Sequence, residues 1–150
     1  IPRVDTFQTV HSALTLPPLC PYTKDIETDT AMVNYEVKGQ LAKLLATENL
    51  IVEHKYVDTA SFDVNNRLLV LPMWKRASNI VYDLLVAHEV GHALFTPNED
   101  PPRNIPFQFI NVVEDARIEK LMKRRYAGLS KTFYRGYSQL SDEDFFGIES

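Results

Sequence analysis

Apolar residues recur along this chain with two periods, and each period predicts a type of element. Residues 50–58 alternate between apolar and polar and are rich in β-branched side chains, which is typical of a strand. Residues 67–71 form a second short apolar run that ends at Pro72. The residues 63–66 between the two runs favour a turn. The pattern therefore predicts two strands in an antiparallel hairpin or meander.

Helical spacing dominates the rest of the chain. Residues 30–49 are predicted to form a helix whose cap is Asp29 or Thr30. Residues 79–96 are apolar on nearly every side and lie between Ser78, a predicted cap, and Pro97, so this helix should be buried. The apolar stripe of the first helix consists of Met32, Val33, Val37, Leu41, Leu44 and Leu45.

Two further helices are expected downstream. The first begins at Pro106 or Phe107 and ends at Tyr126, and a short one covers residues 131–140. Residues 1–29 are rich in proline and have no period, which predicts an irregular arm with a short helix near residues 5–14. The apolar face of the first of these helices consists of Phe109, Ile110, Val113, Ile118, Leu121 and Met122.

The buried helix contains the sequence His88-Glu89-Val90-Gly91-His92. Two histidines four residues apart lie one turn apart on one helix face, where their imidazoles can bind the same metal ion. Glu89 is then placed to act on a water molecule at that metal, because zinc lowers the pKa of its water and a carboxylate takes the proton. The motif predicts metal-assisted hydrolysis.

A catalytic zinc site needs a third protein ligand. No histidine follows His92, so this ligand should be a carboxylate. Glu114 and Asp115 lie in the middle of an apolar helix, where charges are costly unless they are paired or bound to a metal. Glu114 is the predicted ligand, and Asp115 is then the acceptor for an imidazole N–H. The reverse assignment stays open, and Arg117 is a candidate partner for either carboxylate.

These two motifs, the second being Asn111-x-x-Glu114-Asp115, resemble those of gluzincin zinc metallopeptidases. Residues 111–119 are also similar to metallopeptidase domains found with von Willebrand A-type domains in bacteria and tailed phages. The resemblance implies an α+β zincin-like fold, a small sheet on the metal-binding helix, His88, His92 and Glu114 as zinc ligands and Glu89 as general base. The chain departs from the gluzincin pattern because two valines separate Asn111 from the carboxylates.

The function expected is therefore hydrolysis of peptide bonds in a protein or peptide substrate. Zinc peptidases often align the substrate along an edge strand before the metal helix, and residues 68–72 are the expected strand. A tyrosine outside the metal helices often donates to the oxyanion; Tyr134 and Tyr137 are the candidates, with Tyr126 as a third. The alternative is a zinc-bearing structural or binding module of a larger assembly, such as a virion, with little or no peptidase activity.

Composition limits the remaining possibilities. A chain of 150 residues predicts one domain, and a downstream domain could follow it. The net charge of −4 argues against general nucleic-acid binding, and the basic end of the helix that carries Glu114 is either a solvated terminus or a site for an acidic partner. No segment has the length of a membrane span. Cys20 is the single cysteine, which fits a reducing compartment such as the cytoplasm, or the host cytoplasm for a phage protein.

Overall fold

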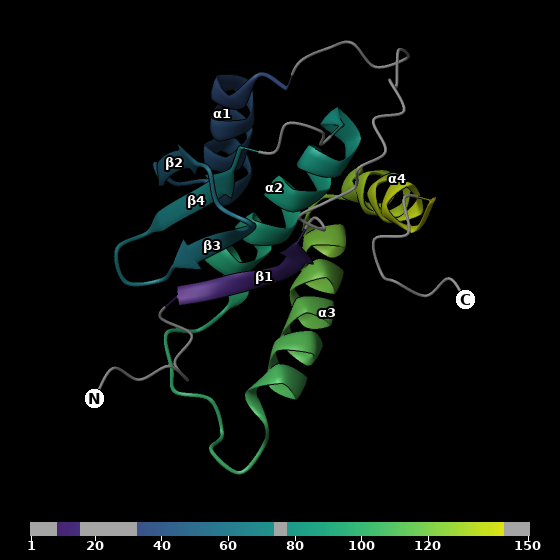
Figure 1. The fold of residues 1–150 in the computed structure, drawn as a ribbon. Helices are drawn as coiled ribbons and strands as arrows, with labels where there is room; N and C mark the ends of the chain where they lie inside the picture. The colour runs from purple at the N-terminus through teal and green to yellow at the C-terminus, as the bar shows by residue number, and fades with distance from the viewer. Residues whose placement is uncertain (1–8, 16–32, 74–77, 143–150) are drawn as a thin grey trace.

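The computed structural model describes residues 9–15, 33–73 and 78–142. It confirms the α+β class: four helices and a four-stranded sheet (Figure 1). The elements are β1 (Thr9–Thr15), α1 (Tyr35–Ala46), β2 (Ile51–Lys55), β3 (Thr59–Asp63), β4 (Leu68–Pro72), α2 (Asn79–Phe95), α3 (Phe107–Arg125) and α4 (Leu129–Asp142).

The strands lie in the order β1-β3-β4-β2. β3 pairs antiparallel with both β1 and β4, whereas β4 and β2 are parallel. Alternate residues of β3 and β4 are buried, so one face of this hairpin contributes to the core. The turn between them forms as expected, because the carboxylate of Asp63 accepts the backbone N–H groups of Asn65 and Asn66 at 2.9 and 3.0 Å.

Two predictions about the sheet and one about the N-terminal arm are wrong. The strand β3 was missed, and it is β3, not β2, that forms the antiparallel hairpin with β4. β4 has β3 on one side and β2 on the other, so it is not an edge strand and its backbone is already paired. The helix expected near residues 5–14 is also wrong for residues 9–14, which form β1 with Val10 opposite Phe62. Residues 1–8 and 16–32 lie outside the described ranges.

The helix α1 begins later than predicted, at Tyr35, because Asn34 caps it by accepting the N–H of Val37 at 3.2 Å. The predicted apolar stripe is right in part: Val33, Leu41 and Leu45 pack against the core, whereas Val37 and Leu44 are exposed. The buried positions of α1 are Lys38 and three small residues, Gly39, Ala42 and Ala46. The helix packs mainly against α2, and a Cβ at Gly39 would be in ordinary contact with the side chain of Val52 in β2, at 3.6 Å.

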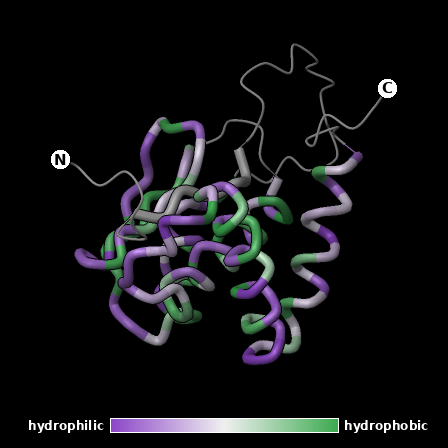
Figure 2. Tube along the Cα trace, turned by 90° about the horizontal axis from the view of Figure 1, so that it is seen from below, coloured by the Kyte–Doolittle hydropathy of each residue, from purple (hydrophilic) through white to green (hydrophobic). Residues whose placement is uncertain are grey.

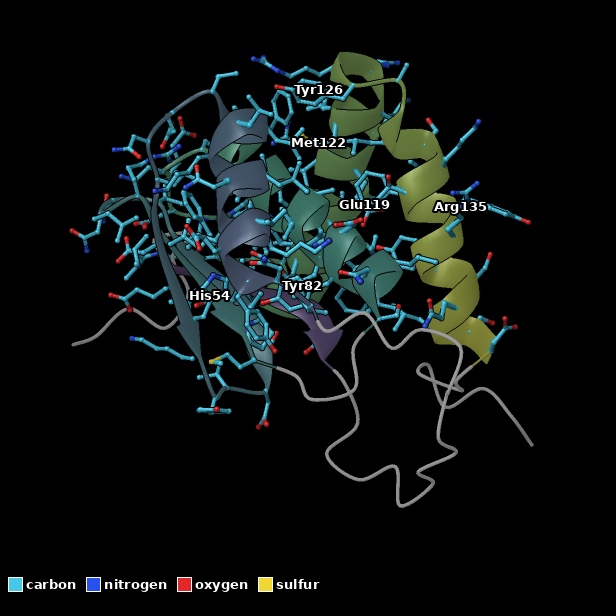
Figure 3. The ribbon with its side chains drawn as sticks, turned by 90° about the horizontal axis from the view of Figure 1, so that it is seen from above. His54, Tyr82, Glu119, Met122, Tyr126 and Arg135 are labelled. Atoms are coloured by element: carbon cyan, nitrogen blue, oxygen red, sulfur yellow. The ribbon has the colours of Figure 1, made fainter. Side chains whose placement is uncertain are left out.

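The helix α2 is the centre of the molecule and contacts α1, α3, α4 and the sheet. Ser78 caps it by accepting the N–H of Val81, as predicted, and residues 84–93 are buried without interruption. The peripheral helices alternate between hydrophilic and hydrophobic positions (Figure 2). Figure 3 shows α1 on the sheet side of α2 and α4 on the opposite side. The structure thus confirms the buried environment predicted for the motif.

Two glycines bring helices close to α2. A Cβ at Gly91 would lie 2.6 Å from Cδ1 of Ile118 and 3.1 Å from Cγ of Met122, so Gly91 leaves room for the buried face of α3. Gly136 does the same for α4 against Leu84. The helix α4 is longer than the predicted 131–140. In the parts of the chain that the structure describes, we find no helix with the length and apolar character of a membrane span.

Candidate metal centre

The two histidines of the motif lie on the face of α2 that packs against α3. Both are buried, and their ring centroids are 4.9 Å apart. Their Nε2 atoms point toward each other, with 3.3 Å between them. The spacing of four residues therefore produces the arrangement predicted for two ligands of one ion.

The carboxylate that joins the histidines is that of Asp115. Its Oδ1 lies 2.9 Å from Nε2 of His92 and 3.3 Å from Nε2 of His88. One ligand atom from each of these three residues lies within 4.8 Å of the other two. The side chain of Asp115 is 15% exposed, so the centre has contact with solvent on this side.

Glu114, the predicted ligand, is turned away from the imidazoles. Its carboxylate accepts two hydrogen bonds from Arg117, at 2.6 and 2.8 Å, and one from the hydroxyl of Thr96 at 2.8 Å. Adjacent helix residues differ by about 100° in direction, so α3 cannot point both carboxylates at the histidines. The structure thus places Asp115, the alternative to Glu114, beside both imidazoles as the candidate ligand, and Arg117 pairs with Glu114.

The Nδ1 atoms of both histidines have partners that fix their protons. Nδ1 of His88 lies 2.9 Å from Oε1 of Glu119, and a carboxylate oxygen accepts. Nδ1 of His92 lies 2.8 Å from the hydroxyl oxygen of Thr96. Because Thr96 donates its hydrogen to Glu114, this oxygen must accept from His92. Both Nδ1 atoms therefore carry hydrogen.

It follows that the Nε2 atom of each neutral imidazole carries a lone pair. These two lone pairs and those of Oδ1 of Asp115 converge on one point. Such an arrangement is repulsive unless a positive charge lies between the three atoms. Partners at Nδ1 that orient the ring are also the usual surroundings of a metal-binding histidine. The residues present fit a metal ion.

The pKa values of His88 and Asp115 reflect the charges and hydrogen bonds around the centre. Burial lowers the pKa of His88, but hydrogen bonds to Asp115 and Glu119 and the charges of Glu89 and Asp115 raise it to about 10. Burial raises the pKa of Asp115, whereas its hydrogen bonds with His88 and His92 lower it to about 2. A raised pKa means that His88 takes up a proton on Nε2 when no metal is bound, so either a proton or a metal ion can supply the positive charge beside the ionised Asp115.

Glu89 is fully buried in the turn of α2 between the two histidines. Its negative charge acts on His88, so its carboxylate belongs to the same electrostatic unit as the candidate ligands. Glu89 therefore adds a second buried carboxylate next to the candidate ligand His88.

The candidate tyrosines differ in their distance from this centre. The hydroxyl of Tyr137 donates to Glu119, which also binds His88. Tyr134 is 75% exposed on α4, and the hydroxyl of Tyr126 donates to the carbonyl oxygen of Leu45 at 2.7 Å. Of the three tyrosines, Tyr137 is the one hydrogen-bonded to a residue beside the histidines, and its hydroxyl hydrogen is already donated to Glu119. Burial and the charge of Glu119 raise its pKa above the ordinary value.

Two residues of the centre were not predicted. Glu119 follows Asp115 by four residues, which places both on one helix face, so its spacing was an available signal. Thr96 follows His92 by four residues in the same way, at the C-terminal cap of α2. His54 lies in β2 beside Tyr35, with 5.2 Å between ring centroids, and is not part of the centre.

Comparisons with protein-family models, curated proteins and solved structures find no match to this chain. The chemistry of the centre therefore has to be argued from its own residues.

Proposed function

We propose that this chain is a zinc-dependent peptidase with His88, His92 and Asp115 as zinc ligands and Glu89 as general base. The observation that carries the proposal is the convergence of three lone-pair donors within 4.8 Å beside a buried glutamate. Two imidazoles and one carboxylate form a typical ligand set of catalytic zinc, which leaves a fourth position for water or substrate.

The residues around the proposed ligands have different chemical roles. Glu119 and Thr96 hold the two imidazoles with Nε2 directed at the ion, through bonds of 2.9 and 2.8 Å. A bound zinc ion supplies Lewis acidity, which polarises a peptide carbonyl and lowers the pKa of water. Glu89 accepts the proton from the attacking water and later passes it to the nitrogen of the leaving amine. Tyr137 donates its single hydroxyl hydrogen to Glu119, so it would have to turn from that carboxylate to donate to an oxyanion.

Substrate alignment requires a strand with a free edge. β4 is excluded because it is paired on both sides, whereas β1 has β3 on one side only among the described strands. β1 also contacts α2, and Figure 1 draws it across that helix toward α3. A substrate segment added to the edge of β1 would be held by backbone hydrogen bonds beside α2, the helix that carries the histidines.

The burial of the histidines favours a second candidate, because structural zinc sites are closed to solvent. In that case the zinc stabilises the contact between α2 and α3 and no peptide is cleaved. Solvent contact at Asp115 supports the catalytic function instead.

One variant separates the two functions. Glu89→Gln keeps the ligands and the shape of the side chain but removes the proton acceptor. We expect it to bind one zinc ion with unchanged affinity and to lose about a hundredfold or more of the cleavage of an unfolded protein such as reduced casein. Zinc is measured by mass spectrometry and cleavage by gel. Equal cleavage by both proteins would refute the mechanism, and zinc without cleavage in the wild type would favour the structural module.

A further inference from the structure

Charge is distributed unevenly along this chain. Residues 120–135 contain six lysines and arginines and no acidic residue. The remaining ten cations and 20 acidic residues give the rest of the chain a formal charge of −10. The cationic segment consists of the end of α3 and the beginning of α4. We call it the basic hairpin.

The six cations of the basic hairpin are exposed to solvent: Lys120, Lys123, Arg124, Arg125, Lys131 and Arg135. None of them forms an ion pair with another residue of the described ranges. In Figure 3, Arg135 extends outward from α4. Their charge is therefore available to a partner, whereas Arg67 and Arg117 elsewhere are paired with glutamates.

A groove lies along α4 beside this segment, with a volume of about 840 Å³. Lys123 supplies a positive charge to it, with its ammonium group 5.4 Å from the ring centroid of the buried Phe133. Asp142 places one carboxylate at the same groove. The other lining residues, apart from the two tyrosines, are serines that can donate hydrogen bonds. The complete lining is Lys123, Ser130, Phe133, Tyr134, Tyr137, Ser138, Ser141 and Asp142.

The groove and the candidate metal centre share a residue. Tyr137 lines the groove and donates to Glu119, which binds His88. A chain segment in the groove would thus lie one side chain away from the centre. We propose that the groove and the basic hairpin bind an acidic segment of the protein substrate; this rests on the proposed peptidase function.

Charge complementarity selects the occupant. The carboxylates of an extended acidic segment would contact Lys123 and the serine hydroxyls in the groove. Lys131 and Arg135 lie on α4, the helix that carries these serines. A long nucleic acid would extend beyond this short segment toward a body of formal charge −10, which repels a polyanion. The groove therefore favours a peptide.

The test measures binding without cleavage. The 150-residue chain carrying Glu89→Gln is titrated, with zinc present, into a fluorescent peptide of about ten residues that alternates glutamate and serine. We expect saturable binding that weakens as salt rises and is about tenfold weaker in Lys123→Glu/Lys131→Glu. Lys123→Arg should retain binding. Arg103→Glu, an exposed cation in the loop before α3, is the matched control and should change affinity by less than about twofold.

The outcomes are distinct. Equal affinity for a peptide of alternating lysine and serine, or unchanged affinity in the charge-reversed variant, would overturn the proposal. Tighter binding of a single-stranded oligonucleotide of equal charge would also overturn it, in favour of nucleic acid. Circular dichroism checks that each variant is folded. If the acidic peptide binds as expected but the wild type cleaves nothing, the peptidase function fails while the acidic-binding groove stands.

Discussion

The hydroxyl of Thr96 joins His92 to Glu114: its oxygen lies 2.8 Å from Nδ1 of His92 and 2.8 Å from Oε1 of Glu114. Arg117 completes the connection, since it pairs with Glu114 and also donates to the carbonyl oxygen of Phe95. The end of α2 is thereby tied to α3. Because the hydroxyl hydrogen of Thr96 is directed at Glu114, the hydroxyl oxygen must accept from His92. The proton of the neutral imidazole therefore lies on Nδ1.

Removing that hydroxyl should weaken metal binding. Thr96→Val has nearly the same shape but cannot accept from His92, so the imidazole loses its fixed orientation. We expect zinc affinity, measured by competition with a chromophoric chelator, to fall about 10- to 100-fold. Thr96→Ser keeps the hydroxyl and should stay within a few-fold of the wild type. Equal affinity in Thr96→Val would mean that this bond has no part in metal binding.

The two neighbouring carboxylates should respond differently to substitution. Asp115→Ala removes a ligand and should lower zinc affinity by more than about a hundredfold. Glu114→Gln keeps an acceptor for Thr96 and should lower it by about tenfold or less. Its main effect should be on the free energy of unfolding without metal, because the charge that faces Arg117 is lost.

Zinc titration and urea denaturation of the two variants measure these effects separately. A loss of zinc affinity in Glu114→Gln as large as that in Asp115→Ala would restore Glu114 as the ligand. Arg103→Gln, a substitution of an exposed loop cation, is the control for loss of a charge at the surface and should leave zinc affinity unchanged.

Sequence alone could predict the helix that carries the motif, because its cap, its length and its apolar character all agree. Sequence could also locate the carboxylate of the candidate metal centre to within one residue. The choice between Glu114 and Asp115 depends on how α3 is rotated about its axis. That rotation is set by Ile118 and Met122 packing over Gly91, a contact between helices that no local pattern contains.

The predicted apolar face of α3 is right in part for the same reason. Phe109 and Val113 were expected in the core and are exposed, whereas Ile118 and Met122 are buried as expected. The sheet shows a related limit, because β2 pairs in parallel with β4 although β3 lies between them in the sequence. The turn at residues 63–66 could be predicted, because it depends on a local interaction: the side chain of Asp63 accepts a backbone N–H only two residues away.

That turn should make stability depend on pH. Burial raises the pKa of Asp63, but hydrogen bonds from Asn66 and Asn65 outweigh it and lower the pKa below the ordinary 3.8. A carboxylate with a lowered pKa in the folded state stabilises it above pH 3.8, and this contribution is lost as pH falls through the lowered value. Asp63→Asn should thus be less stable than the wild type at neutral pH. Urea denaturation should find the difference smaller at pH 3, and a difference independent of pH would contradict the assignment.

The contact between Gly136 and Leu84 gives the last prediction. A Cβ at position 136 would lie 2.6 Å from Cβ of Leu84 and 2.7 Å from its Cδ2. Rotation of the leucine side chain cannot move its Cβ, so α4 must shift away from α2. Overpacking of this kind costs about 1–3 kcal/mol, partly offset by about 1 kcal/mol of helix propensity.

The net loss is about 0–2 kcal/mol, and because the clash is with the immobile Cβ of Leu84 we expect Gly136→Ala to lie in the upper half of that range, about 1–2 kcal/mol in urea denaturation. Because Tyr137 is the next residue, the shift should also disturb its bond to Glu119 and weaken zinc binding by a few-fold. Gly128→Ala is the matched control, since nothing lies within 4 Å of a Cβ there, and its stability should stay within about 0.5 kcal/mol of the wild type. Equal stability of the two variants would show that α4 can move from α2 without cost, which would remove the packing argument for the position of Tyr137.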